Sequence, residues 1–261
     1  MGLKDKVVFI TDGLSPAGQG IAARLAEEGA RVAANVFPAG PGSSVRAELV
    51  THGDPLSGAS IEGAVREVLD TYGCIDVLVF NNNELIPAAL EFCDDETYDR
   101  VMGVNVKSAY LYVRAAGPAM KERRAGNFVF VSSIHGEKPF GGCFAYSMAK
   151  GCLKNLAREM VLDMGKYNIR TNVIEMGPME GSWEDFYSDA SPLYEHARER
   201  VNGPRMGTVQ DIAEAVLYFA GGGSGFANGS ELRLDGGFLL TYVTARRNLD
   251  RATGEEIKQI W

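Results

Sequence analysis

Two neighbouring stretches, Asn127-Phe-Val-Phe-Val-Ser-Ser133 and Ala145-Tyr-Ser-Met-Ala-Lys150, decide the fold of this chain. The first is a short apolar run of aromatic and β-branched residues, which predicts a buried strand that ends at Ser132–Ser133. The second follows a glycine-rich loop and opens a segment with apolar residues at helical spacing, among them Leu153 and Met160. The two stretches therefore predict a buried strand that leads through a loop into a helix.

Tyr146 and Lys150 are four residues apart, so on a helix they share one face and lie one turn apart. An ammonium group at that distance favours loss of the phenol proton. Ser133, at the end of the preceding strand, can orient a substrate oxygen. Together the three predict a proton-transfer site with Tyr146 as general acid or base and Lys150 as the group that tunes it. A Tyr-x-x-x-Lys pair taken alone is also an ordinary feature of helices.

Strand-like and helix-like segments alternate along the chain. Strands are predicted at residues 6–11, 31–36, 45–51, 75–80, 127–132, 170–175 and 231–234, and helices before Gly29 and at 61–72, 95–119, 146–165 and 209–220. Pro118 is expected to mark a break near the end of its helix. The alternation predicts an α/β fold, a doubly wound parallel sheet of the Rossmann-like kind in a single domain at residues 1–244. Residues 245–261 form a charged C-terminal tail.

Composition excludes several classes of function. The chain has 261 residues and a net charge of −8, which argues against nucleic acid and anionic membranes as partners. No run of about 18 apolar residues and no signal peptide is found, so a cytoplasmic protein is expected. The four cysteines include no Cys-x-x-Cys, and the three histidines lie far apart in the sequence. Reduced thiols and no metal site are therefore expected.

A glycine-rich turn, Asp12-Gly-Leu-Ser-Pro-Ala-Gly-Gln-Gly20, follows the first predicted strand. A strand, such a turn, a helix and a second strand in succession form the opening of a dinucleotide-binding βαβ unit. Backbone N–H groups of the loop then approach a pyrophosphate at the N-terminus of the helix. By itself, a glycine-rich turn is only a weak indication of a nucleotide site.

With these segments in place, the chain resembles the short-chain dehydrogenase/reductase family over about residues 4–240. The resemblance is carried by Ser133 with Tyr-Ser-Met-Ala-Lys at residues 146–150, by Asn105 in Val-Asn-Val-Lys, and by the C-terminal pattern over residues 205–237. It implies a nicotinamide-dependent oxidoreductase that reduces a carbonyl or oxidises a secondary alcohol of a small molecule. It also implies assembly as a homodimer or homotetramer.

The resemblance further implies a catalytic tetrad of Asn105, Ser133, Tyr146 and Lys150. In the family the tyrosine exchanges the proton while nicotinamide passes the hydride. The lysine also holds the nicotinamide ribose, and the asparagine holds a water in the proton relay. The implied cofactor is NAD or NADP, and the residues expected to hold it are Thr11, Asp12, Gly13, Ser15, Gly18, Asn81, Lys150 and Gly177.

The nucleotide half departs from the family pattern. In the family's Thr-Gly-x-x-x-Gly-x-Gly turn, Asp12 takes the place of the first glycine, Pro16 the second and Gly18 the third. A carboxylate there repels a pyrophosphate unless a cation intervenes, and a proline removes a backbone donor. The family's Asn-Asn-Ala-Gly becomes Phe80-Asn-Asn-Asn83, and its Pro-Gly becomes Met176-Gly177.

The connection after the second strand departs in length. Only a Pro/Gly/Ser loop over residues 37–44 separates the second and third predicted strands, where a crossover needs about a dozen residues or more. A helix of about ten residues is expected to be missing. The second strand ends at Val36-Phe37 without a carboxylate for an adenosine ribose. Arg46, farther along, is positioned in sequence to meet a 2′-phosphate.

These departures leave a second class of function open: a non-redox enzyme on the same fold that has lost nucleotide binding and uses Tyr146 for proton transfer. The halohydrin dehalogenases resemble this pattern, with a degenerate glycine-rich turn, although they carry Arg where this chain has Lys150. An epimerase, a dehydratase or a cyclase also fits. In this alternative Pro16, Phe80 and Met176 are expected to fill or reshape the nucleotide space. A catalytically silent, interaction-only member is the remaining possibility.

Substrate contacts are expected from the loops after the strands. A long, weakly periodic and aromatic segment at about 177–203 is predicted to act as a lid, with a surface helix pair as the alternative. The residues expected to face substrate are His135, Cys143, Met179, Trp183 and Phe186. For His135 a loop histidine bonded to backbone, and for Cys143 a buried small hydrophobe, are the structural alternatives.

Overall fold

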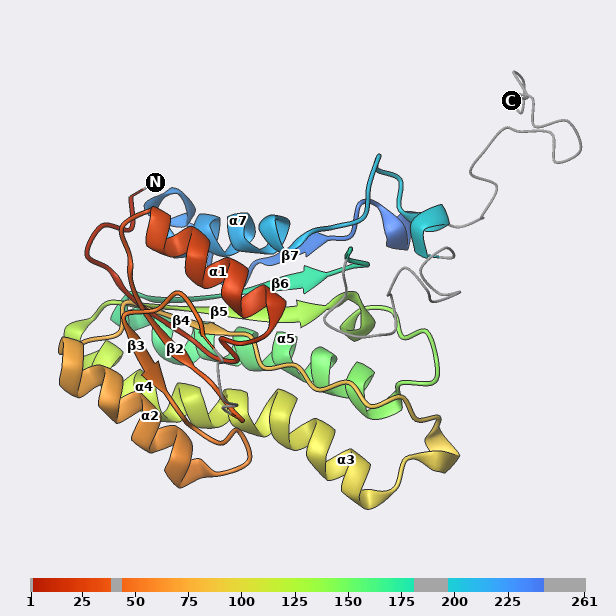
Figure 1. Cartoon of the computed structure of the whole chain (residues 1–261), viewed down its shortest axis with the longest axis horizontal. Helices are drawn as coiled ribbons and strands as arrows, with labels where there is room; N and C mark the ends of the chain where they lie inside the picture. Colours follow the sequence, from red (N-terminus) through yellow and green to blue (C-terminus); the bar gives the residue numbers. More distant parts are fainter. Residues whose placement is uncertain (1, 39–43, 181–196, 242–261) are drawn as a thin grey trace, which may run out of the picture.

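The described residues form a seven-stranded parallel sheet in the order β3-β2-β1-β4-β5-β6-β7, shown in Figure 1. The computed structural model describes residues 2–38, 44–180 and 197–241 of the chain. The strands are β1 (Val7–Ile10), β2 (Arg31–Asn35), β3 (Leu49–Thr51), β4 (Val77–Phe80), β5 (Gly126–Ser133), β6 (Ile169–Met176) and β7 (Glu231–Leu234). The order confirms the predicted doubly wound sheet, because the chain runs outward in both directions from β1 and β4.

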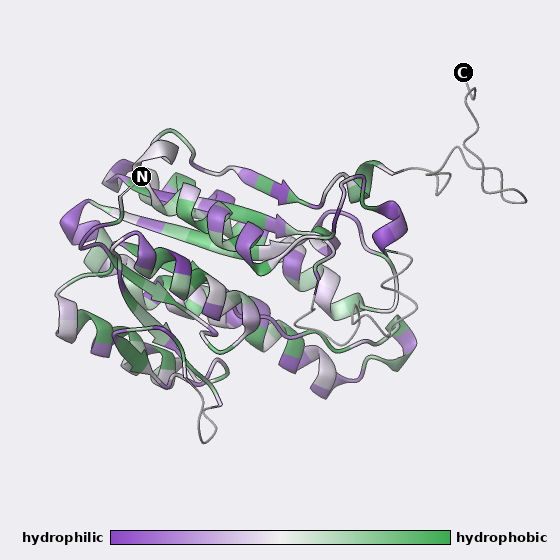
Figure 2. Ribbon diagram, turned by 45° about the horizontal axis from the view of Figure 1, so that its top comes forward, coloured by the Kyte–Doolittle hydropathy of each residue, from purple (hydrophilic) through white to green (hydrophobic). Residues whose placement is uncertain are grey.

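Helices cover both faces of the sheet (Figure 1). One face carries α1 (Pro16–Glu27) and α7 (Val209–Ala220), and the other carries α2 (Gly58–Tyr72), α4 (Ser108–Arg123) and α5 (Phe144–Met164). The helix α3 (Asp95–Met102) packs near the start of α5. Figure 2 shows apolar residues along the strands and polar residues on the outer faces of the helices, the pattern of a parallel sheet buried on both sides.

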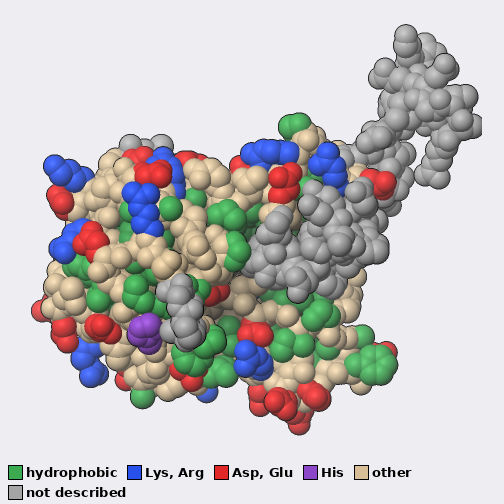
Figure 3. All heavy atoms as spheres, in the orientation of Figure 1, with side chains coloured by type: hydrophobic (Ala, Val, Ile, Leu, Met, Phe, Trp, Pro, Cys, Tyr) green, Lys and Arg blue, Asp and Glu red, His purple; other side chains and the backbone are tan. Residues whose placement is uncertain are grey.

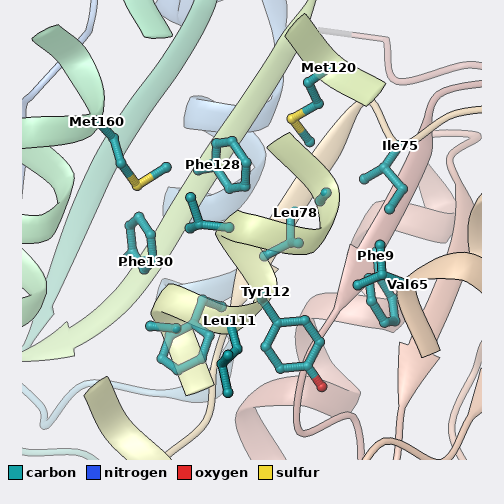
Figure 4. Packing of buried hydrophobic residues seen from close by; sticks show 14 of the residues in the cluster. Phe9, Val65, Ile75, Leu78, Leu111, Tyr112, Met120, Phe128, Phe130 and Met160 are labelled. Carbon is teal, nitrogen blue, oxygen red and sulfur yellow. The ribbon is translucent and has the colours of Figure 1, made fainter. Parts of the chain in front are cut away.

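The core on the α2, α4 and α5 side is rich in aromatic rings, several of which appear in Figure 4. Phe80 is fully buried there, and its ring centroid lies 6.3 Å from that of Tyr112 and 5.9 Å from that of Phe130. Phe80 therefore fills the core, so the expectation that it fills the nucleotide space is wrong. Met176 is also buried, in the core between the sheet and the α1 and α7 layer.

The connection between β2 and β3 contains no helix in its described residues, 36–38 and 44–48, as the sequence predicted. The two strands nevertheless pair in parallel, with Ala33 opposite Leu49 and Asn35 opposite Thr51. Only three residues form β3, so the third strand is shorter than the predicted 45–51. In the described part of this connection no crossover helix covers the edge of the sheet.

The predicted long helix at 95–119 is interrupted by a π-helical turn, η2 (Gly103–Lys107), between α3 and α4. The prediction that Pro118 marks a break is wrong, since α4 continues through it to Arg123. At the π turn the Asn105 side chain donates to the carbonyl of Val101, 2.9 Å away, and so occupies the acceptor of an ordinary helical bond. π turns inside helices are frequent at functional sites.

Two predicted features fall partly or wholly outside the described residues. They are the lid at 177–203, of which 181–196 is not described, and the tail at 245–261. Among the residues that are described, no helix is long and apolar enough to cross a membrane. On the face shown in Figure 3, lysine and arginine side chains are interspersed with acidic ones and do not gather into one patch.

Candidate active site

Tyr146 and Lys150, the predicted catalytic pair, lie in the first two turns of α5, which follows β5 in the chain. Tyr146 and Lys150 are 2% and 1% exposed, and the Lys150 ammonium lies 5.2 Å from the centroid of the Tyr146 ring. Lys150 also donates to the carbonyl oxygen of Asn82 at 3.4 Å. The helical spacing thus brings the two together as predicted. Burying an ammonium is costly unless polar groups surround it, and the loop after β4 supplies one.

The phenol of Tyr146 has a partner that sequence reasoning missed. Its hydroxyl donates to Oδ1 of Asn83 at 3.0 Å. Asn83 follows β4 and stands where the family pattern has a glycine, so a side chain now reaches a place that the family leaves open. The substitution was visible in the sequence, but its contact with Tyr146 joins residues 63 positions apart and carries no local signal.

Ser133 ends β5, and His135 follows it in a short 3₁₀ turn. The Ser133 hydroxyl accepts the backbone N–H of His135 at 3.2 Å. The imidazole packs edge-on against the Tyr146 ring, with centroids 5.5 Å apart, and against Phe140. Burial, together with the charge of Lys150, lowers the pKa of His135 to about 4, so its ring is neutral near pH 7. Ser133, His135 and Tyr146 therefore form one continuous wall.

Nδ1 of His135 is buried and makes no hydrogen bond within the described part of the chain. A buried polar atom without a partner costs free energy, so the position is suited to a bound polar group. The structural alternative, a loop histidine bonded to backbone, is not tested by the Nδ1 contact alone and stays open.

Asn105 is fully buried in the π turn, and its described hydrogen bonds go to backbone groups. Its Nδ2 donates to the carbonyls of Glu84 and Val101, and its Oδ1 accepts the N–H of Glu84 at 3.4 Å. The residue thus fixes the loop that carries Asn82 and Asn83. Its predicted place in a proton relay stays a prediction.

Hydrogen bonds link the residues that follow β1 to those that follow β4. Thr11 Oγ1 accepts the backbone N–H of Asn81 at 2.8 Å, and the Asn81 amide donates to the Asp12 carbonyl and to Ser15 Oγ. Oδ1 of Asn81 is buried and has no partner in the part of the chain that the structure describes. The predicted nucleotide-binding residues Thr11, Asp12, Ser15 and Asn81 therefore meet at the switch point of the sheet.

The turn itself is tightly packed. Asp12 has φ +49°, in the left-handed region that favours Gly, Asn and Asp. A Cβ on Gly18 would lie 2.2 Å from the Asp12 carbonyl oxygen, and one on Gly13 would lie 2.8 Å from Cβ of Ala34. These glycines are thus required by close approach of the turn to α1 and β2. Gly177 serves in the same way, because its Cβ would lie 2.6 Å from Asp235.

Pro16 occupies the first position of α1, where a helix has no need of the missing N–H, and its side chain is exposed. That its ring fills or reshapes the nucleotide space stays a prediction. Arg46 is exposed, and its guanidinium lies 3.6 Å from the carboxylate of Glu27. The Glu27 carboxylate therefore competes with a 2′-phosphate for the Arg46 guanidinium.

A cavity of about 130 Å³ opens between the turn, the end of β2 and the loop after β4. Three carboxylates line it, those of Asp12, Asp54 and Glu84, together with Asn35, Asn83 and Arg100. Burial raises the pKa of Asp12 to about 6, against the opposing effect of hydrogen bonds from Ser15 and the charge of Lys150. Arg100 lies 3.0 Å from Glu84, so that pair is internally neutralised.

The remaining substrate candidates are placed as follows. Cys143 is buried just before α5, in a small apolar cluster with Val101 and Tyr146. Met179 is 2% exposed and packs in the core on the α1 and α7 side, so its contact with substrate stays a prediction. Trp183 and Phe186 lie outside the described residues.

One turn beyond Lys150, α5 buries a second lysine that sequence reasoning did not single out. Lys154 Nζ lies 2.6 Å from Glu137, 2.8 Å from Glu175 and 2.9 Å from Glu231. The three carboxylates come together from the loop after β5 and from strands β6 and β7. Lys154 lies at the centre of this group and links α5 to the sheet.

Comparisons with known proteins identify the family of the chain. Residues 15–239 match the family model described as Enoyl-(Acyl carrier protein) reductase. The chain is 32% identical to 2-(S)-hydroxypropyl-CoM dehydrogenase 3 of Xanthobacter autotrophicus, covering 90% of this chain and 97% of that protein. It is 32% identical to an uncharacterised oxidoreductase of Thermotoga maritima, covering 91% and 98%.

A solved short-chain dehydrogenase/reductase from Serratia marcescens is 29% identical with a TM-score of 0.82, covering 91% of this chain and 99% of that one. The likeness in sequence and in structure thus extends over nine-tenths of the chain. The protein therefore belongs to the short-chain dehydrogenase/reductase family and is an oxidoreductase of that family's type.

Proposed function

We propose that this protein is an NAD(P)-dependent oxidoreductase that interconverts a carbonyl and a secondary alcohol on a small molecule. The observation that carries the proposal is the buried Tyr146–Lys150 pair at the carboxyl edge of the sheet, beside the switch point where ligands bind in doubly wound folds. Relatives named as dehydrogenases, and a similar solved protein in complex with NADPH, support it.

The chain's own residues supply the proton chemistry. Tyr146 gives a proton to the substrate oxygen in reduction and takes it back in oxidation, and the neighbouring Lys150 ammonium stabilises the phenolate form. The Ser133 hydroxyl donates to the same substrate oxygen and fixes its distance from the phenol. Nicotinamide, when bound, supplies or accepts the hydride. The substrate oxygen replaces Asn83 Oδ1 as the partner of the phenol.

The residues at the switch point fit a dinucleotide in part. Asn81 Oδ1 is a buried acceptor without a partner in the described part of the chain, which suits a ribose hydroxyl or an amino group. In this proposal Lys150, which donates to the carbonyl oxygen of Asn82, also donates to the nicotinamide ribose, and Asp54 offers an acceptor in the cavity. The diphosphate is the part that fits least well, because Asp12 lines the same space.

The second candidate is non-redox proton transfer by Tyr146 without a nucleotide, and Asp12 is the observation that favours it. In that case a vicinal haloalcohol or an epoxide is the natural test compound. The lid at 177–203, the cytoplasmic location and the homodimer or homotetramer remain parts of the same proposal, and the family resemblance supports the oligomer.

The test is a Tyr146→Phe variant, which removes the proton donor and keeps the ring that packs against His135. Nucleotide affinity, measured by calorimetry, should stay within about threefold of the parent, since phenol loss leaves Lys150 and the turn intact. Turnover of ketones and secondary alcohols should fall by roughly 10²-fold or more. Tyr146→Phe with undiminished turnover would contradict the assigned role, and activity on haloalcohols without nucleotide would favour the second candidate.

A further inference from the structure

The carboxyl group of Asp12 stands at the place where a doubly wound sheet receives the charged part of its ligand. Asp12 follows β1, and its carbonyl accepts a hydrogen bond from Asn81, which follows β4. β1 and β4 are adjacent, and the strand order reverses direction between them. Ligands bind outside the carboxyl ends of strands at such a point, and the N-terminus of α1 adjoins it.

The donors that usually balance a diphosphate at this place are reduced in number. Pro16 has no N–H, and the N–H of Gly18 is already bonded to Ser15 Oγ at 3.1 Å. The guanidinium of Arg100 is the cation among the described residues that line the cavity, and it is paired with Glu84. A diphosphate entering here therefore meets a carboxylate and few free donors.

The groups that face Asp12 come from every surrounding element. Ser15, in its own turn, and Lys150, from α5, favour the charged carboxylate, whereas Glu84, after β4, favours the neutral acid. Asp54, after β3, lines the same cavity. On α4, the charge of Asp12 acts together with burial to raise the pKa of the Tyr112 hydroxyl. The balance already raises the pKa of Asp12 to about 6 in the free protein. A diphosphate adds two negative charges at short range and shifts that balance farther toward the acid.

We propose that binding of a nucleotide diphosphate at this site is coupled to the uptake of one proton by Asp12, so that the protein binds its cofactor with Asp12 as the neutral acid. The proposal rests on the proposed function, since it concerns the same nucleotide. As a neutral acid the side chain is a hydrogen-bond donor to a phosphate oxygen and supplies the donor that the turn lacks. Asp12, which stands in place of the family's first glycine, thus makes a contact with the phosphate that depends on its proton.

The coupling has a measurable size. When only the protonated form binds, the apparent dissociation constant equals the intrinsic one divided by the protonated fraction. With a free pKa of about 6, that fraction falls from about one half at pH 6 to about one hundredth at pH 8. The affinity for NADH or NADPH should therefore weaken by roughly 50-fold between these two pH values, and by tenfold per unit above pH 7.

The left-handed backbone at Asp12 provides matched variants, because Asn and Gly adopt φ +49° as readily as Asp. Asp12→Asn is a neutral isostere, and Asp12→Gly restores the residue of the family pattern. The experiment is calorimetric titration of NADH and NADPH at pH 6, 7 and 8, in two buffers with different ionisation enthalpies, for the parent and both variants. EDTA is present in one series and Mg²⁺ in another.

The parent should lose about 50-fold in affinity from pH 6 to pH 8 and take up close to one proton at pH 8. Both variants should lose most of that dependence and bind more tightly than the parent at pH 8. The same pH slope in Asp12→Asn would overturn the coupling, as would Mg²⁺ restoring the parent's affinity at pH 8. Binding without pH dependence would leave the oxidoreductase standing and remove this proposal, whereas no binding by any of the three proteins would remove both.

Discussion

The charge on Asp12 has a consequence for the free protein that requires no ligand at all. Its pKa is raised from 3.8 to about 6, chiefly by burial, so the native state binds this proton more tightly than the unfolded chain. Between these two values the native state therefore carries more protons, and its stability falls as pH rises. The cost is absent well below pH 4 and is complete above about pH 7.

The magnitude follows from the shift. A difference of about two pKa units corresponds to about 3 kcal/mol of unfolding free energy at neutral pH. The Asp12→Asn variant removes the charge and keeps an oxygen that accepts the hydrogen bonds offered by Ser15. It should therefore be more stable than the parent by about 2–3 kcal/mol at pH 7, and by less than about 1 kcal/mol at pH 4.

Urea unfolding of both proteins at pH 4, 5.5 and 7, followed by tryptophan fluorescence and circular dichroism, measures this difference. Asp12→Gly serves as the control, because it also removes the carboxyl group at a backbone conformation suited to glycine. Both variants should show the same widening gap as pH rises. A gap that stays constant across the three pH values, or that narrows toward pH 7, would refute the view that Asp12 is held as a destabilised carboxylate.

Two further predictions concern the catalytic helix and its partner loop. Lys154→Met should cost about 3–5 kcal/mol in urea unfolding, because it leaves the buried Glu175 and the neighbouring Glu137 without their cation, whereas Glu231 keeps Arg158. Adding Glu175→Gln should recover part of the loss, and an additive effect would contradict the network. Asn83→Gly removes the acceptor of the Tyr146 hydroxyl, a hydrogen bond that stabilises the neutral phenol. The acid limb of the pH–rate profile for alcohol oxidation should therefore move to lower pH by roughly one unit. An unmoved limb would show that the bond is not retained in solution.

Local patterns predicted the parts of this molecule that depend on neighbours in sequence. The Tyr146–Lys150 pair follows from helical spacing, and the strands follow from runs of buried apolar residues such as Phe128–Val131. The prediction that the β2–β3 connection has no helix followed from chain length alone, and the described residues 36–38 and 44–48 contain none. The bounds of α7, Val209–Ala220, agree with the prediction, and the structure shows a capping box at its start.

Contacts between distant residues were beyond the reach of such patterns. The bond from Tyr146 to Asn83 and the ion pairs of Lys154 join separate loops and strands, and a lysine in a helix is ordinarily a surface residue. The π turn at Asn105 arises because a side chain takes a helical acceptor, which periodicity does not register. Pro118 was a misleading signal, because the packing of α4 against the sheet outweighs the loss of one backbone N–H.

At the nucleotide site, one prediction agrees with the structure and two do not. Asp12 was recognised as a departure with an electrostatic consequence, and the structure places it in the cavity at the switch point. Phe80 and Met176 were expected to occupy the same space, but both point into the core, because successive residues of a strand face opposite sides of the sheet and only the structure fixes the side.

The most direct test of the account is a calorimetric titration of the purified protein with NAD⁺, NADH, NADP⁺ and NADPH at pH 6, where about half of Asp12 is protonated. The account predicts binding of at least one pair at micromolar affinity or better, with stoichiometry of one per chain. No detectable binding of any of the four, by the parent and by Asp12→Gly alike, would contradict it and leave Tyr146 as the centre of a non-redox enzyme.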